Sequence, residues 1–296
     1  MLTELYEKVY EILNDWIFQS ETHLRIAFFI GIFLILALSE FLFPKRSKNI
    51  GVPQKVRWIS NLSIMILDNL IMRLILPLLS IGMAVLAQKY DWGIFNRYEI
   101  PYWLNLLLTI VVLDLVIYLQ HIMFHAVPIF WRFHRMHHAD LDFDVTTGIR
   151  FHPIEIILSM GIKIGAVALI GASPLGVLVF EVLLNATSMF SHSNLRLPLL
   201  IDRVVRYGIV TPDMHRVHHS IQGHETNSNF GFNFSIWDRL FGTYLDQPSA
   251  GHLKMTIGIT DFRNSKYLRL DWLLLIPFIG KISNYAINYR KFGKDD

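Results

Sequence analysis

Residues 102–125, YWLNLLLTIVVLDLVIYLQHIMFH, decide what kind of fold this chain adopts. The stretch holds one acidic residue and neither lysine nor arginine, and about 20 apolar residues suffice to cross the hydrocarbon core of a bilayer. Residues 102–124 are therefore predicted to form a transmembrane helix. Residues 24–43 and 63–87 are two further apolar stretches of the required length.

Residues 156–190 are longer and are interrupted near the middle by Gly171 and Pro174, which predict a turn between two shorter spans. Hydrophobic residues make up 53% of the chain and the mean hydropathy is positive, which favours an integral membrane protein over a soluble domain. We therefore predict one all-α membrane domain over residues 1–296. It should have about four transmembrane helices, two of them forming a hairpin, and a cytoplasmic helical cap that carries the histidines.

Both ends of the chain are expected to lie on the membrane rather than to cross it. Residues 1–23 carry five acidic residues and one lysine, which is the wrong charge for the start of a signal peptide. Apolar residues at helical spacing between residues 2 and 18 predict an amphipathic helix on the bilayer surface or, equally, one packed against the spans. The apolar run within residues 266–292 is too short to span, so an interfacial helix is predicted there.

The basic loop over residues 44–59 predicts how the chain is oriented. Its five basic residues and lack of acidic ones are typical of a cytoplasmic loop. The N-terminus is then expected outside, and the histidines and residues 193–296 on the cytoplasmic side. The net charge of +3 comes with no nucleic-acid signature, so the basic residues are expected to contact anionic membrane lipids. The five residues are Lys45, Arg46, Lys48, Lys55 and Arg57.

Eleven of the thirteen histidines fall between residues 121 and 224. The pattern His-Arg-x-His-His occurs at 134–138 and at 215–219, and HIMFH at 121–125 adds a pair spaced by four residues. These spacings place the rings of each motif on one helical face. Imidazole binds zinc, iron, copper and nickel, and nine donors fit two ions better than one. The proposed ligands are His121, His125, His134, His137, His138, His192, His215, His218 and His219.

A single histidine at a membrane boundary more often packs or faces headgroups than binds a metal. Burying this many imidazoles near lipid would be costly without partners, so the clusters favour a metal site. The chain has no cysteine, which excludes thiolate ligands and disulfides.

Two predicted spans also present a polar stripe that ends in a histidine, His121 on the third span and His192 at the end of the hairpin. At about 1.5 Å per residue, the carboxylates of these stripes lie too deep to share an ion with those histidines. We interpret the stripes as outer support or as the lining of a substrate path or, equally, as structural polar contacts. The residues are Asp114, Tyr118, Glu181 and Asn185.

The motifs HIMFH, HRMHH, HSN and HRVHH, followed by ETNSNFGFNFSIWDRLFGTY, resemble in this order the fatty acid hydroxylase superfamily. Its members include sterol desaturases and alkylglycerol monooxygenases, and the resemblance covers roughly residues 104–245, with a bacterial-type pattern. Members are helical membrane enzymes whose histidines hold a di-iron centre that activates O2 against an unactivated C–H bond. The resemblance thus implies two iron ions on the nine histidines, and zinc can replace iron in purified protein.

Two positions qualify this resemblance. Several relatives carry another histidine four residues before the one that follows the hairpin, but here that position is Ser188. The ion facing it is therefore expected to have one nitrogen fewer or a water instead. His152, in RFHPIE, is common to bacterial-type relatives and is interpreted as a ligand, as a supporting residue or as a helix cap.

Charged neighbours of the motifs are predicted to support the histidines. Arg135 and Arg216 could orient carboxylates that hold the rings or, equally, contact headgroups. Asn229 is a candidate support for a metal-bound water, and Trp237 is expected to close the cytoplasmic cap. The candidate carboxylates are Asp144, Glu155 and Asp238. The histidines expected outside the site are His23, His224 and His252.

These features predict a membrane-bound di-iron oxygenase that hydroxylates or desaturates a lipid with O2. The lipid is expected to reach the metals from the bilayer between the third span and the hairpin. The sequence carries no haem, flavin, dinucleotide or iron–sulfur motif, so electrons should come from a separate cytochrome, ferredoxin or reductase. A metal-binding membrane protein without catalysis and a zinc-dependent membrane hydrolase stay open as alternatives. A zinc protease is disfavoured because HExxH and HxxEH are absent.

Overall fold

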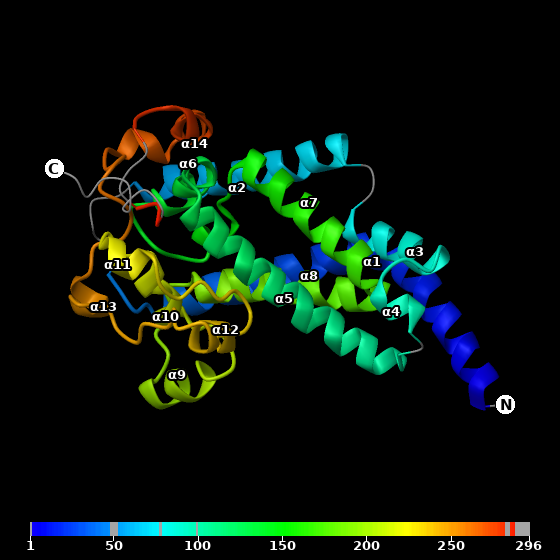
Figure 1. Cartoon of the computed structure of the whole chain (residues 1–296). Helices are drawn as coiled ribbons and strands as arrows, with labels where there is room; N and C mark the ends of the chain where they lie inside the picture. The colour runs from blue at the N-terminus through cyan, green and yellow to red at the C-terminus, as the bar shows by residue number, and fades with distance from the viewer. Residues whose placement is uncertain (1, 48–52, 77–78, 99, 282–284, 288–296) are drawn as a thin grey trace.

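The computed structural model describes residues 2–47, 53–76, 79–98, 100–281 and 285–287, with side chains from Thr22 onward. Every regular element of this described part is a helix, and its only strand-like pairings are three isolated bridges. The predicted all-α architecture is confirmed for these residues. Figure 1 shows long helices side by side, with shorter helices gathered at the end farthest from the N-terminus, here termed the cap end.

Five long helices form the body of the molecule. Four of the five candidate membrane spans that length and composition define among the described residues lie within single long helices, and the fifth runs from α2 on to Arg97. The sequence predicted about four spans, two of them the arms of the hairpin; by length and composition five helical stretches qualify, and each arm, at 18 residues, is among them. The long helices are α1 (Leu2–Leu42), α2 (Gln54–Ile75), α5 (Tyr102–Ala126), α7 (Pro153–Ile170) and α8 (Pro174–Ser191).

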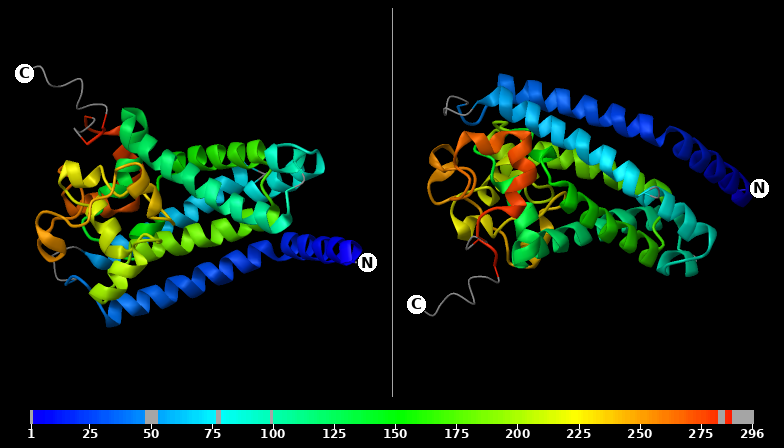
Figure 2. Two further views of the ribbon diagram at one scale, coloured as in Figure 1. Left: turned by 60° about the horizontal axis from the view of Figure 1, so that its bottom comes forward. Right: turned by 90° about the horizontal axis from the view of Figure 1, so that it is seen from above.

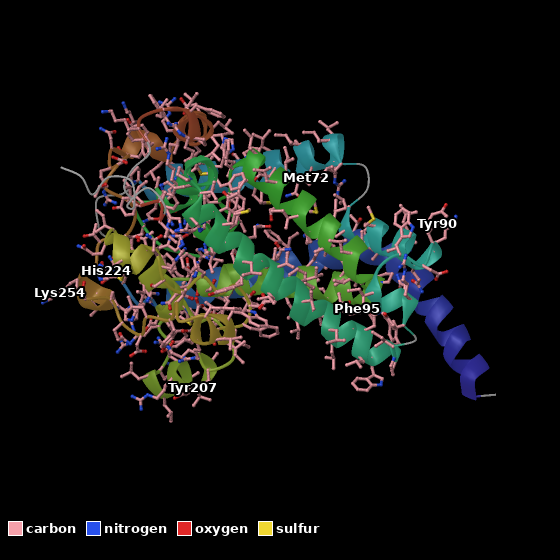
Figure 3. All side chains as sticks on the ribbon, viewed as in Figure 1. Met72, Tyr90, Phe95, Tyr207, His224 and Lys254 are labelled. Atoms are coloured by element: carbon pink, nitrogen blue, oxygen red, sulfur yellow. The ribbon has the colours of Figure 1, made fainter. Side chains whose placement is uncertain are left out.

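The shorter elements connect the long helices and build the cap end. The helices are α3 (Ser80–Lys89), α4 (Ile94–Arg97), α6 (Pro128–His138), α9 (Leu199–Val205), α10 (Pro212–His218), α11 (Gly223–Thr226), α12 (Ile236–Leu240), α13 (Gly251–Lys254) and α14 (Leu270–Leu275). The 3-10 turns are η1 (Thr147–Ile149), η2 (Ser265–Leu268) and η3 (Ile276–Phe278). Figure 3 places the labelled side chains of His224 and Lys254 on the outer edge of the cap end.

Helix α1 is continuous from Leu2 to Leu42, where the sequence predicted a surface helix followed by a separate span. The backbone continues without a break, and Figure 2 shows α1 along one side of the bundle. The side chains that would make residues 2–18 amphipathic lie outside the described ones. Contact of this segment with the membrane surface therefore stays a prediction.

The apolar stretch over residues 63–87 lies within one candidate span but is divided between two helices. Helix α2 ends at Ile75 and α3 begins at Ser80. Pro77 lies between them in the sequence, and a proline disfavours helical backbone in the residue before it. Leu76 accordingly leaves the helical region, with ψ of 87°.

The predicted hairpin is confirmed, and local sequence explains its turn. Helix α7 ends at Gly171, whose φ of 71° is the left-handed conformation that glycine adopts without strain. Helix α8 begins with Pro174 at its first position, and the Ser173 hydroxyl accepts a hydrogen bond from Gly176 N at 3.0 Å. Helices α5, α7 and α8 then share an apolar core that includes Leu113 and Phe180.

The C-terminal segment differs from the single interfacial helix expected over residues 266–292. Its described part is divided into η2, α14 and η3, and Pro277 lies inside the last of these turns. Leu273 and Ile276 are fully buried and pack in one cluster with Trp131 of α6. Ile287 N donates a hydrogen bond to His125 O at 2.9 Å. The segment therefore covers the cap end, and residues 282–284 and 288–292 lie outside the described residues.

Candidate metal centre

Nine buried histidines converge at the cap end of the long helices. They form two groups, and within each group one ring nitrogen per residue lies within 4.8 Å of the others. The structure thus brings together all nine predicted ligands and, among the described residues, no other histidine. The five-histidine group contains His121, His125, His134, His138 and His218. The four-histidine group contains His137, His192, His215 and His219.

The spacing within each His-Arg-x-His-His motif explains how the groups divide. Two residues that are four apart differ in direction by only about 40° around a helix. The residue three positions after the first of them is rotated from the first in the opposite direction. On α6, the outer pair therefore joins the five-histidine group and His137 joins the four-histidine group. On α10, the outer pair joins the four-histidine group and His218 joins the five-histidine group. Each motif consequently spans both groups and holds them together.

The inward-facing nitrogens lie very close to one another. His121 Nε2 is 3.2 Å from His134 Nε2, and His192 Nε2 is 3.0–3.1 Å from the Nε2 atoms of three other histidines. In the five-histidine group, both ring nitrogens of His138 and the Nε2 atoms of His125 and His218 are buried without a hydrogen-bond partner in the described part. Converging, unpartnered imidazole nitrogens of this kind are the donor set that a transition metal requires, so the residues fit two such ions.

Oxygen acceptors fix the tautomer of most of these rings. A carbonyl oxygen can only accept, so an Nδ1 beside it carries the hydrogen and leaves the lone pair of Nε2 facing inward. His125 and His134 use side-chain acceptors instead, Asn227 Oδ1 at 3.1 Å and Glu155 Oε1 at 2.6 Å. The carbonyl pairs are His121 with Phe230, His137 with Arg150, His192 with Ser188 and His218 with Ser228, at 2.7–2.9 Å.

Burial keeps these rings neutral. Desolvation, followed by repulsion from neighbouring histidines, holds the pKa of five rings outside the long helices well below the usual 6.5. Desolvation likewise lowers the pKa of His192 to about 4. Neutral imidazole is the form that binds metals, so the site is in its ligating state at neutral pH. The five rings are those of His137, His138, His215, His218 and His219.

One predicted carboxylate directly supports a histidine. Glu155 lies in the first turn of α7, is 4% exposed, and accepts from His134 Nδ1. A carboxylate at this position orients the ring and raises the basicity of its other nitrogen. The prediction that Glu155 supports the site therefore agrees with the geometry.

The predicted role of the two motif arginines is wrong. Arg135 donates to Ile276 O at 2.7 Å and to Lys281 O at 2.8 Å, so it holds the C-terminal segment. Arg216 pairs with Asp213 three residues before it. A guanidinium can satisfy backbone carbonyls as well as carboxylates, and the sequence alone does not reveal which lie within reach.

Two other arginines support the histidines, and the sequence analysis missed both. Arg57, assigned to a basic loop, is fully buried in α2, where Nε donates to Asp140 at 2.7 Å and Nη1 donates to Asp144. Arg150 donates to Met136 O at 3.1 Å, and its own carbonyl holds His137. The sequence did contain a signal for the burial of Arg57. The buried face of α2 holds four residues at helical spacing, Arg57, Asn61, Ile64 and Asp68.

Asp238 acts on a histidine through the backbone. Its carboxylate accepts from Phe230 N at 2.7 Å and Gly231 N at 2.8 Å, and so fixes the carbonyl that holds His121. Asn229 does not support a metal-bound water as predicted, because its side-chain amide is used by the backbone of Met214 and Leu245.

The hydrogen bonds of His152 and Ser188 show what role each side chain has. His152 caps α7, since Nδ1 accepts from Ile154 N at 3.2 Å and Nε2 donates to Leu274 O at 3.3 Å. It belongs to neither histidine group, so the ligand reading is wrong and the cap reading agrees with the structure. The Ser188 hydroxyl donates to Gly148 O at 2.8 Å, and the group facing it has four histidines rather than five.

The polar stripes of the spans mainly make structural contacts. Asp114 accepts from Trp237 Nε1 at 2.8 Å, and Tyr118 shares a hydrogen bond of 2.8 Å with Thr243. Both therefore tie α5 to the loop around α12. Trp237, predicted to close the cap, instead lies against the middle of a long helix.

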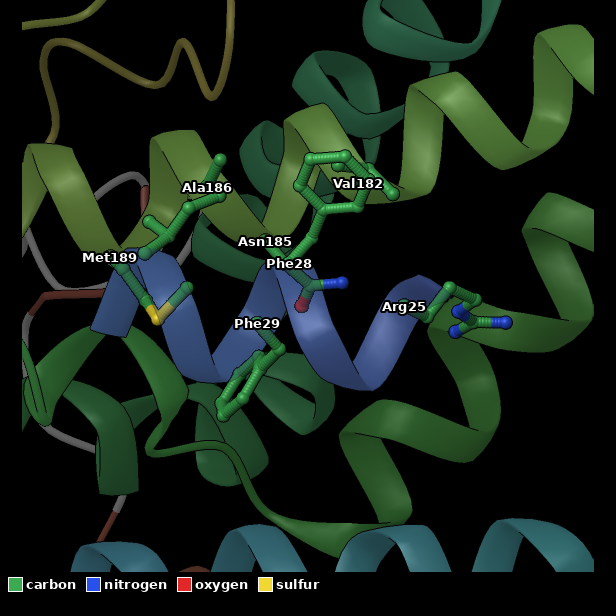
Figure 4. A pocket seen from close by; sticks show the side chains of 8 residues that line it. Arg25, Phe28, Phe29, Val182, Asn185, Ala186 and Met189 are labelled. Atoms are coloured by element: carbon green, nitrogen blue, oxygen red, sulfur yellow. The ribbon is translucent and has the colours of Figure 1, made fainter. Parts of the chain in front are cut away.

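The deeper carboxylate on α8 is also structural. Glu181 pairs with Lys163 Nζ at 2.5 Å and with Arg25 Nη1 at 3.0 Å, joining α8 to α7 and α1. Asn185 donates to Glu181 O at 2.8 Å and lines a small pocket between α1 and α8. Figure 4 shows Asn185 and Met189 of α8 and Arg25 of α1 among the side chains that line this pocket.

The three remaining histidines lie outside both groups, as expected. His224 is 66% exposed on α11, whereas His252 is buried near Asp213. His23 lies on an exposed face of α1.

Comparison with known proteins shows what the histidine region is similar to. Residues 106–243 match the family model described as fatty acid hydroxylase, and this range contains all nine histidines. The chain is 32% identical to ornithine lipid hydroxylase OlsE of Rhizobium tropici over 54% of this chain and 47% of that protein. It is 29% identical to alkylglycerol monooxygenase of Xenopus tropicalis, over 60% and 39%. It is also 29% identical to cholesterol 25-hydroxylase of Homo sapiens, over 47% and 50%.

The matched regions span about half or less of the length of these relatives. No solved structure matches the chain. The family model, the named relatives and the order of the histidine motifs agree with one another. Residues 106–243 are thus similar to the fatty acid hydroxylase family, and the chain resembles lipid hydroxylases and monooxygenases over this region.

Proposed function

We propose that this chain is a membrane-bound di-iron oxygenase that hydroxylates or desaturates an unactivated C–H bond of a lipid. The observation that carries the proposal is the pair of histidine groups, five and four buried rings whose free nitrogens converge. The relatives are named as hydroxylases or monooxygenases of ornithine lipid, alkylglycerol and cholesterol, which supports a lipid substrate. Two iron ions, when bound to these groups, would supply the activation of O2.

The chain itself positions the ligands and excludes water. Trp131, Phe143 and Phe230 are at most 1% exposed and pack directly against histidine rings. A dry apolar wall of this kind protects a reactive oxidant from solvent and suits an alkyl chain as substrate. Glu155 and the carbonyls of the site hold each ring in the ligating tautomer.

The proposed membrane topology follows the charge pattern. The five long apolar helices would cross the bilayer, with the histidines on the cytoplasmic side and the N-terminus outside. The basic loop also serves the fold, because Lys45 pairs with Asp213 at 2.6 Å and Arg46 donates to His252 O at 2.6 Å. An external cytochrome, ferredoxin or reductase would deliver electrons to the cap end.

Metal analysis and lipid analysis of matched variants test this function. The purified chain should hold two iron ions, and membranes that contain it should accumulate a lipid that has gained one oxygen or lost two hydrogens. His218→Ala and His137→Ala, one from each group, should lose iron and this product. His224→Ala changes an exposed histidine outside both groups and should behave as the wild type. Unchanged lipids in the presence of O2 and a competent reductant, or full iron loading of both inner variants, would contradict the proposal.

A further inference from the structure

Residues 232–241, here termed the α12 segment, are tied to the middle of a long apolar helix. Asp114 lies twelve residues from either end of α5 (114 − 102 and 126 − 114), which is about 18 Å from both. Its carboxylate accepts from Asn233 N at 3.2 Å, Phe234 N at 3.1 Å and Trp237 Nε1 at 2.8 Å. Because α5 is a candidate span, the α12 segment lies at the depth of the hydrocarbon core rather than at the membrane surface.

The backbone of the α12 segment is satisfied within the protein, as an irregular segment inside a bilayer requires. Besides the two N–H groups bound by Asp114, Ser235 N donates to Gly208 O at 3.2 Å. Asn233 O accepts from Val210 N at 3.1 Å, and Phe241 N donates to Trp237 O at 2.8 Å. These internal bonds remove the main cost of placing non-helical chain in lipid.

The outer surface of the α12 segment is mainly apolar, with Arg239 as its one partly exposed charged residue. Ile236, Leu240 and Phe241 are 53%, 67% and 51% exposed. Helix α9, joined to this segment through the bond from Ser235 Oγ to Arg206 O at 2.7 Å, adds more side chains of this kind. A contiguous surface of large exposed apolar residues beside a span suits contact with lipid chains, not water. The exposed apolar residues of α9 are Leu199, Leu200, Ile201 and Val204.

The inner end of the α12 segment reaches the histidines. The ring of Phe232 lies 5.2 Å from that of His121 and 6.5 Å from that of His215, so it contacts one ligand of each group. Phe232 also packs against the core shared by α5 and α8, and it is partly exposed. Phe230, on the same loop, is 1% exposed and contacts only the five-histidine group. Phe232 therefore stands between the lipid-facing surface and both groups.

We propose that the α12 segment is a bilayer-immersed gate through which a lipid chain passes between α5 and α8, and that Phe232 sets which part of the chain faces the metals. The occupant is an alkyl chain of a bilayer lipid, because the large exposed side chains of the outer face are mainly apolar; the exceptions are Arg203 and the half-buried Arg239, whose guanidinium stacks on Tyr244. Asp114 acts as the positioning residue that latches the segment to α5. The lipid's role as substrate rests on the proposed oxygenase function, whereas the immersion of the segment does not.

The first experiment measures immersion. Because the chain has no cysteine, Leu240→Cys and the control His224→Cys each introduce one site for a nitroxide label. In phosphatidylcholine vesicles, the label at residue 240 should collide more with O2 than with a water-soluble nickel chelate. The label at residue 224, on the exposed α11, should show the reverse. If the labels at both positions collided more with the nickel chelate than with O2, the proposal of a gate would be refuted, whether or not the protein oxidises lipid.

The second experiment measures passage. Phe232→Cys in vesicles should react with hexadecyl methanethiosulfonate but not with a charged, water-soluble analogue. Phe143→Cys, which replaces a fully buried neighbour of the four-histidine group, should stay unmodified. Lack of reaction at residue 232 in protein that keeps its two ions would overturn the passage.

A third variant reports on the chemistry. Phe232→Leu should keep both ions and yet change the position of oxidation along the lipid chain. An unchanged product position would refute the role of Phe232 in selecting that position. If the wild type oxidises no lipid, the proposed function fails while the two labelling experiments still decide the gate.

Discussion

Replacing Arg57 with methionine should destabilise the fold more than any single surface change. Arg57 is fully buried, and its guanidinium pairs with both Asp140 and Asp144. Both aspartates are at most 1% exposed. Arg57→Met keeps the apolar bulk but leaves the buried Asp144 without its cation, and Asp140 with only Arg150, whose Nη1 is 4.0 Å away. Removing one partner of a buried ion pair costs about 3–5 kcal/mol. A chain of this size loses about 2 °C of melting temperature per kcal/mol, so we expect a fall of roughly 6–10 °C.

The exposed pair of Arg269 and Asp271 provides the matched control. Their side chains are 62% and 54% exposed, and such pairs contribute about 0–1 kcal/mol. Both variants should be melted in the same detergent at several heating rates, with intrinsic fluorescence as the signal. Arg57→Met should also bind less metal in the four-histidine group, because Arg57 holds the loop that leads to the carbonyl supporting His137. A melting temperature within about 2 °C of that of Arg269→Met would refute the reasoning.

Two further changes test other contacts. Glu155→Gln should weaken metal retention about 10- to 100-fold in chelator competition, because the carboxylate supports the His134 ring. Unchanged retention would contradict that supporting role. Gly148→Ala places a Cβ 2.6 Å from Ser188 O and should lower the free energy of unfolding by about 1–3 kcal/mol. The control Gly31→Ala adds a Cβ in open space and should raise the free energy of unfolding by up to about 1 kcal/mol.

Local spacing was enough to predict the histidine groups. The repeat of His-Arg-x-His-His fixes which rings share a helical face, and a helix is a rigid enough element to preserve that order in three dimensions. The hairpin turn was predictable for the same reason, since Gly171 and Pro174 act on their own neighbours. Properties set within one or two turns of helix can be read from sequence.

Partners that are distant in sequence were not predictable. Arg57 looked like a loop cation, but its carboxylates lie 83 and 87 residues away. Arg135 looked like a ligand support, but its acceptors are carbonyls of the C-terminal segment. Asp114 left a functional and a structural reading open, and only the packing of α12 against α5 distinguishes them. Each case depends on which chain segment folds over the residue.

The contact between Ile287 and His125 has a consequence for how this protein matures. The last described residue of the chain bonds to the helix that carries the first two ligand rings. During synthesis the nascent polypeptide must therefore emerge as far as Ile287 before that wall can close. Metal capture would then follow the synthesis of this segment, and a ribosome that stalls before it would leave the imidazoles open to whichever cation is abundant.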